Sequence, residues 1–274
     1  MENLKVLIPT NFSVQAEYAY QMVKNLEEKI SIEIHFIHVL NAPDTVSIDK
    51  DGIIQTCGEI SIDYIESQKK IAEEKLNNLK FLYGNHIITH LELGKLTDKI
   101  VSYAEENKFD LIVMGTKGAW GLKEKLSGSE AQVIARTSQI PLLSLMCDRS
   151  KLSIENILIV NNFMHPKNEQ LLFLHKLINA FNTKVHLLQI IANRSDDHKK
   201  EVYASMDEFA KLNSFVAYEK HLLEDSDVEN GVVHFNQKQE MDMVCIGTHG
   251  RGSFFHESAT EKLINHLFRA CSKT

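Results

Sequence analysis

The sequence predicts an α/β protein built from two tandem copies of one open parallel sheet, each with helices on both faces. Three observations support this prediction. Short apolar segments alternate with helix-like periodic segments along the chain, which is typical of parallel strands joined by crossover helices. The apolar segments have the length of buried strands. Two stretches of the first half recur in the second half, and such a repeat indicates duplicated domains.

The first copy begins with a strand, a helix and a second strand. Residues 4–9 form an apolar run. Ser13 is placed to cap the helix that follows, because apolar residues recur after it at helical spacing: Ala16, Ala19, Met22, Val23 and Leu26. Residues 32–40 are expected to form the second strand.

A long polar segment separates the second strand from the next helix. We expect residues 41–58 to form a solvated surface connection, with a lid as the alternative. Helical spacing follows over 60–82, a strand is expected over 87–93 and a helix over 96–107. The copy is expected to end with a strand over 140–145, so strands and helices alternate throughout it.

Residues 110–129 combine a buried strand, a glycine-rich turn and the start of a helix. Residues 111–114 form an uninterrupted apolar run, which is typical of a central strand covered on both faces. Glycines that permit close backbone approaches follow it: Gly115, Gly118, Gly121 and Gly128. Free N–H groups at the helix start could bind a phosphate. As the alternative, Ser129 and Gln132 form a capping box, and the glycines only turn the chain.

The same pattern then occurs a second time. IENILIVNNF near residue 155 resembles LKVLIPTNF at the start of the sequence. DMVCIGTHG at residues 242–250 resembles DLIVMGTKG at residues 110–118. The repeat indicates two domains, residues 1–148 and residues 153–274.

Composition and charge argue against several classes of protein. The net charge of -7 disfavours a general nucleic-acid surface or an anionic-membrane binder. No apolar run approaches the length of a membrane span, and the first ten residues lack the pattern of a signal peptide, so a cytoplasmic location is expected. The four cysteines contain no CxxC pair and the thirteen histidines show no zinc-ligand spacing. We therefore expect no metal site in the protein, and ordinary core or surface histidines.

The glycine-rich segment resembles the signature of the universal stress protein family. Nucleotide-binding members carry Gly-x2-Gly-x9-Gly-Ser/Thr after the fourth strand, and this spacing is matched in full by Gly115, Gly118, Gly128 and Ser129. The resemblance covers nearly the entire chain, in the tandem form of the family. It implies two Rossmann-like domains with five-stranded parallel sheets. The ligand would lie beyond the carboxyl ends of the first and fourth strands, at a topological switch point.

The resemblance implies ATP or another adenine nucleotide as the ligand of the first domain. Asn11 stands where ATP-binding members usually have an aspartate, and the backbone of Val39 would meet the adenine. An asparagine can still accept a hydrogen bond from a ribose hydroxyl, but it lacks the charge. Mg²⁺ could accompany the phosphates. The expected nucleotide-binding residues are Thr10, Asn11, Val39, Met114, Gly115, Lys117, Gly118, Gly128 and Ser129.

The second copy departs from the family signature. Thr260 stands ten residues beyond Gly250, where the family has a glycine, and an alignment of the helix starts places Glu257 against Gly128. A carboxylate would then face any phosphate. No counterpart of residues 141–145 follows, so we expect the second sheet to lack its fifth strand. One nucleotide per chain is therefore expected, in the first domain.

Three functions are compatible with these residues. The leading hypothesis is a cytoplasmic stress-response protein whose bound nucleotide changes the interaction with a partner. The second is an enzyme, either a slow ATPase or an adenylate-transferring protein. We find no P-loop, general base or nucleophile near the glycine-rich turn, and so name no catalytic residue. The third is an interaction protein that binds no nucleotide. The two copies are expected to pack as an internal pseudo-dimer, and a homo-oligomer is compatible with this arrangement.

Overall fold

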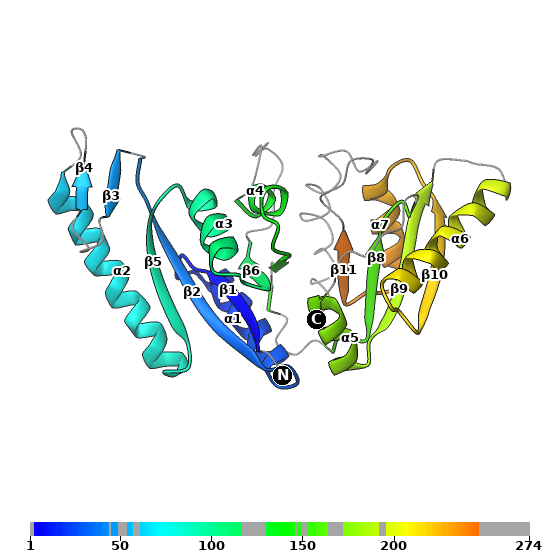
Figure 1. Ribbon diagram of the computed structural model, residues 1–274, viewed down its shortest axis with the longest axis horizontal. Helices are drawn as coiled ribbons and strands as arrows, with labels where there is room; N and C mark the ends of the chain where they lie inside the picture. Colours follow the sequence, from blue (N-terminus) through cyan, green and yellow to red (C-terminus); the bar gives the residue numbers. More distant parts are fainter. Residues whose placement is uncertain are drawn as a thin grey trace. The chain divides into compact units, whose positions relative to one another are not determined.

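The computed structural model divides the chain into two compact units, Met1–Ser150 and Lys151–Thr274. Each unit contains a parallel sheet flanked by helices (Figure 1). None of the helices in the described part of the chain is long and apolar enough to cross a bilayer. The described residues are 3–43, 45–48, 54–56, 61–116, 130–145, 147–148, 153–163, 172–191 and 196–246.

The first unit is built on a five-stranded parallel sheet with the strand order β5-β2-β1-β6-β7. The two strands near its centre consist almost wholly of buried residues, in agreement with their uninterrupted apolar sequences. The strands are β1 (Leu4–Pro9), β2 (Ile32–Asn41), β5 (Ile88–Gly94), β6 (Leu111–Gly115) and β7 (Leu142–Leu145).

Two helices cover each face of this sheet. On one face, α1 (Val14–Glu27) and α2 (Ile62–Tyr83) meet where the ring of Tyr20 lies 3.9 Å from Tyr83 and 5.7 Å from Phe36. The next residue of β2, Ile37, points to the opposite face. There it shares a core cluster with α3 (Leu96–Glu106) and α4 (Glu130–Thr137). The predicted α/β architecture is therefore confirmed.

The segment between β2 and α2 differs from the expected connection. In it, β3 (Val46–Ile48) pairs with β4 (Ile54–Thr56) as a two-stranded antiparallel sheet. The prediction of a solvated connection over residues 41–58 was therefore wrong for these strands, because their apolar side chains pack on α2 and β5. The buried residues of this small cluster are Ala42, Val46, Ile54, Ile65 and Leu93.

The described part of the second unit forms a four-stranded parallel sheet with the order β10-β9-β8-β11. This strand count agrees with the prediction. The strands are β8 (Asn156–Val160), β9 (Lys184–Ile191), β10 (Tyr218–Glu224) and β11 (Met243–Ile246). The helices are α5 (Leu172–Phe181), α6 (Asp196–Leu212) and α7 (Val228–Lys238).

The sequence repeat is also visible in individual hydrogen bonds. In the first unit, Asp110 Oδ2 accepts from the Lys5 amide at 2.7 Å, and in the second, Asp242 Oδ2 accepts from the Asn156 amide at 2.8 Å. Phe12 and Phe163, which follow the first strand of each unit, have positive φ angles of 61° and 51°. The two units are therefore structural copies, with Lys5 corresponding to Asn156.

Candidate functional site

The carboxyl ends of three adjacent strands form the candidate site of the first unit. β1 pairs with β2 on one side, with Pro9 opposite Ile37, and with β6 on the other, with Leu7 opposite Ile112. After β1 the chain crosses to β2, and after β6 it crosses in the opposite direction to β7. The boundary between β1 and β6 is therefore a topological switch point. Ligands of open α/β sheets bind at such edges.

The turn after β1 is held by a set of local hydrogen bonds. The Thr10 amide donates to the Ile37 carbonyl at 2.8 Å, and Thr10 Oγ1 accepts from the Phe12 amide at 3.0 Å. Asn11 Oδ1 accepts from the Ser13 amide at 3.1 Å. Asn11 is exposed at the carboxyl end of the sheet, and its amide oxygen stabilises the turn that leads into α1.

His38 is a supporting residue that sequence analysis did not identify. Its Nδ1 donates to the Thr10 carbonyl at 2.7 Å, and its ring lies 4.6 Å from the ring of Phe12. Burial lowers the pKa of His38, which favours the neutral ring. His38 thus fixes the position of the turn after β1. His38 and Thr10 are far apart in the sequence, and the pairing of β1 with β2 brings them together.

Gly115 is required by the packing of the first helix. A Cβ atom at this position would lie 1.7 Å from the carbonyl oxygen of Gln15, far closer than any allowed contact. The sequence analysis attributed a close approach to this glycine, and the structure shows that the approaching group is the backbone of α1. Gly115 therefore has a structural role whether or not a phosphate binds.

Val39 and Met114 reach the same edge, but their side chains are buried. Both belong to the core cluster beneath α3 and α4, together with Leu7 and Ile112. Their backbone groups are therefore the parts that could face a ligand. Five expected residues thus share one edge: Thr10, Asn11, Val39, Met114 and Gly115. The remaining ones lie outside the described residues: Lys117, Gly118, Gly128 and Ser129.

Comparison with known proteins identifies the family. The family model described as the Universal stress protein family matches residues 2–145, more than half of the chain. The chain belongs to the universal stress protein family. This membership confirms the resemblance that was inferred from the glycine signature.

Individual relatives agree with this assignment. Universal stress protein MJ0531 of Methanocaldococcus jannaschii is 31% identical over 148 residues, which is 52% of this chain and 82% of that protein. MJ0577 of the same organism is 28% identical over 149 residues, 51% of this chain and 92% of that protein. The crystal structure of a universal stress protein from Archaeoglobus fulgidus covers 97% of this chain and 96% of its own, with a TM-score of 0.70 and 15% identity. That likeness concerns the fold.

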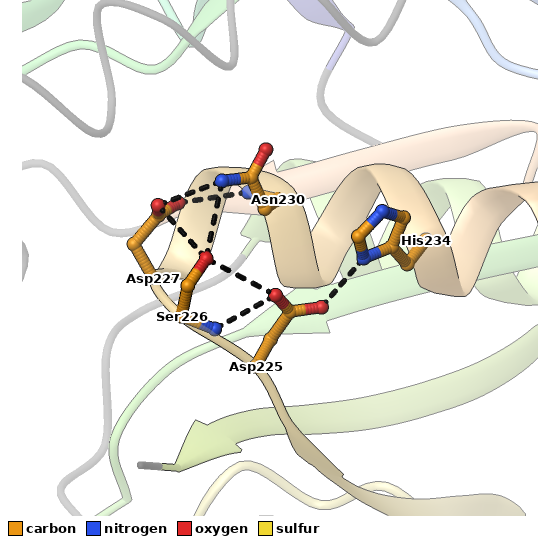
Figure 2. A network of polar contacts seen from close by, with 5 residues as sticks. All are labelled: Asp225, Ser226, Asp227, Asn230 and His234. Carbon is orange, nitrogen blue, oxygen red and sulfur yellow. Dashed lines mark hydrogen bonds and ion pairs between the residues drawn. The ribbon is translucent and has the colours of Figure 1, made fainter.

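The second unit of this universal stress protein carries carboxylates where β10 ends and α7 begins (Figure 2). Asp227 caps α7 by accepting from the Asn230 amide at 2.9 Å. One oxygen of Asp225 accepts from the Ser226 amide at 2.7 Å, and the other contacts His234 Nδ1 at 2.6 Å. These groups occupy the helix start with protein carboxylates, which disfavours an anionic ligand there.

The corresponding helix start of the first unit is different. The residue that caps α3 is Lys95, which makes no side-chain capping bond and pairs instead with Asp98 at 3.0 Å. The two copies of this universal stress protein therefore share a backbone but differ in the charge placed along the carboxyl edge.

Proposed function

We propose that the first domain, residues 1–148, binds ATP or another adenine nucleotide. The observation that supports this most strongly is the switch point, where β1, which leads into Thr10 and Asn11, lies beside β6, which ends at Gly115. The same unit has the complete glycine signature of nucleotide-binding family members, which continues directly from Gly115. An arrangement needed only for folding would not require the later glycines of that signature.

Each part of the nucleotide has a proposed partner. Backbone N–H groups of the segment from Gly118 to Ser129 bind the phosphates, and Lys117 adds a positive charge. Asn11 hydrogen-bonds to the ribose, and the backbone at Val39 and Met114 lines the nucleoside end. Mg²⁺ accompanies the phosphates through their own oxygens and water.

The proposed activity is binding without turnover. The bound state of this cytoplasmic stress-response protein changes its interaction with a partner. The second domain, residues 153–274, is a degenerate copy that binds no nucleotide and packs with the first as an internal pseudo-dimer. β7 is an edge strand of the first sheet, which makes it the proposed contact. Slow ATP hydrolysis or adenylate transfer is one alternative. A role without nucleotide is the other, and the following experiment addresses it.

Gly128→Glu tests the proposal directly. The substitution copies the second domain and places a carboxylate about 4 Å from a phosphate charge, which costs on the order of 4 kcal/mol at an intermediate dielectric. Calorimetric titration with ATP should show a loss of roughly a thousandfold in affinity. The same exchange at Gly250, in the second copy, adds the same charge and should leave the affinity unchanged. Equal affinities for the wild type and a normally folded Gly128→Glu protein would reject the assigned phosphate site.

A further inference from the structure

Both units contain a pair of histidines on adjacent strands. In the first unit, His35 of β2 and His90 of β5 approach with Nδ1 and Nε2 2.8 Å apart. In the second, His186 of β9 and His221 of β10 repeat this arrangement with the same two atoms 2.9 Å apart. Each histidine lies at least three residues before the carboxyl end of its strand. The two pairs differ in the protein groups that face their ring nitrogens.

The second pair has a third potential ligand. β10 places Glu219 two residues before His221, on the same face of the strand and directly opposite His186. Glu219 Oε2 lies 3.4 Å from His186 Nδ1 and 3.7 Å from His221 Nε2. Ligand atoms about 2.0–2.1 Å from a tetrahedral zinc ion are about 3.3 Å apart, so these three atoms already have nearly the required spacing.

We propose that His186 Nδ1, His221 Nε2 and Glu219 Oε2 bind one zinc ion, which connects β9 to the edge strand β10. Two imidazoles and a carboxylate form a known type of zinc ligand set, with a water molecule as the fourth ligand. His186 is fully buried, whereas 43% of the Glu219 side chain is exposed. The ion therefore enters from the side of Glu219, where the fourth position is open to water.

The hydrogen bonds around His186 favour the ligand form of its ring. Its Nε2 lies 3.2 Å from Asn156 Oδ1, an acceptor, so Nε2 carries the proton. Nδ1 is then the unprotonated nitrogen, which accepts hydrogen bonds from its neighbours until a metal replaces them. Gln239 Nε2, a donor, lies 3.4 Å from the same Nδ1. A second hydrogen bond that fixes the tautomer and orientation of a metal-binding histidine is typical of zinc sites.

In the first unit, protein groups occupy the ring nitrogens of both histidines. The Tyr103 hydroxyl donates to His90 Nδ1 at 2.7 Å, His90 Nε2 donates to His35 Nδ1, and His35 Nε2 donates to Glu33 Oε1 at 2.5 Å. Every ring nitrogen of this pair has a protein partner, and the tautomer of His90 is fixed.

The residues that complete the first pair are replaced in the second unit. Ile88 lies opposite His35 in the register, where Glu219 lies opposite His186. Phe235, which lacks a hydroxyl group, packs 4.8 Å from His221 in the way that Tyr103 packs on His90. His221 can therefore move its proton to Nδ1 and present Nε2 to a metal. One cation opposes the site: Lys184 Nζ contacts the other oxygen of Glu219 at 2.5 Å, but this lysine is 49% exposed and can turn to water.

Zinc binding by the untagged full-length chain tests the proposal. Equilibrium dialysis against zinc, followed by metal analysis, should give one tightly bound ion per chain. Glu219→Gln and His221→Gln should each lower the affinity at least about tenfold. With cobalt as the probe, the wild type should show the absorption of a four-coordinate nitrogen and oxygen site, and both variants should lose it.

The first histidine pair provides the matched control. His90→Gln removes the corresponding histidine of the first unit and should leave zinc affinity unchanged. Circular dichroism shows whether each variant is folded, and Glu219→Gln changes only a half-exposed side chain. Unchanged zinc affinity in Glu219→Gln and His221→Gln, or an equal loss in His90→Gln, would overturn the proposal.

Discussion

At the scale of single residues, Gly115 belongs to the proposed nucleotide site and is also required by the packing of the fold. The backbone of α1 lies where a side chain would begin, so the glycine is needed before any ligand binds. The proposed phosphate-binding loop would therefore start from a fixed position. The same glycine thus places the end of β6 against the helix that begins after Asn11.

Gly115→Ala should destabilise the first unit. The new Cβ would meet the Gln15 carbonyl oxygen, which is backbone and can move only together with α1. Overpacking of this kind typically costs about 1–3 kcal/mol, and a backbone clash belongs at the upper end. Urea denaturation should measure the change. The comparison is Gly231→Ala, whose Cβ would meet only side-chain atoms of Ile190, 2.6–2.9 Å away, and no backbone, so its cost should be smaller. Equal stabilities of the Gly115→Ala variant and the wild type would contradict this role.

Part of the candidate site could be predicted from the sequence, whereas the residues that support it could not. Thr10, Asn11 and Gly115 were identifiable because they follow strands whose order can be inferred from alternation and from the family signature. The use of Asn11 Oδ1 in a turn and the support from His38 depend on contacts across the sheet. Such contacts follow from the strand register, which the pattern of apolar residues does not specify atom by atom.

At the scale of elements, a chain of hydrogen bonds joins α3 to the sheet. It runs from Tyr103 through His90 of β5 to His35 and Glu33 of β2. Burial, with smaller contributions from His35, Lys5 and Lys80, lowers the pKa of His90 to about 4. With Tyr103 donating to His90 Nδ1, both rings of this chain are neutral, and protonation of His90 would reverse its hydrogen bond with Tyr103.

The stability of the first unit should therefore fall in acid. The unfolded chain binds a proton at His90 near the ordinary pKa of about 6.5, whereas the folded chain resists it until about pH 4. The contribution is present above about pH 6.5 and is lost as the pH falls toward about 4, by at most about 3 kcal/mol. His90→Gln should flatten this dependence in urea denaturation between about pH 7 and about pH 4.5. An equally steep decline in the variant would show that other groups are responsible.

The regular elements were predictable, whereas the short ones were not. Strands and helices of the two sheets have apolar patterns long enough to be recognised, as in residues 111–114. β3 and β4 are only three residues each within a polar segment, so their pattern was too short to indicate strands. The Glu219-x-His221 spacing is a signal that could have been noticed, because residues two apart share one face of a strand. His186, on another strand, could be joined to it only through the fold.

At the scale of the whole molecule, the two copies have kept one backbone and diverged in chemistry. Both retain the aspartate that bonds to the first strand, through Asp110 and Asp242. The first has the full glycine signature, whereas the second has carboxylates at the start of α7 and the proposed zinc ligands on β9 and β10. The chain therefore contains two copies of one scaffold, and we propose that only the first binds a nucleotide.

Native mass spectrometry of the freshly purified full-length chain, with and without added ATP, tests this central claim most directly. We expect one adenine nucleotide per chain at saturation, because only the first copy has the full loop and an uncharged residue at Gly128. The Gly128→Glu protein should show none. Two equivalent nucleotides per chain, or none at saturating ATP, would contradict the account.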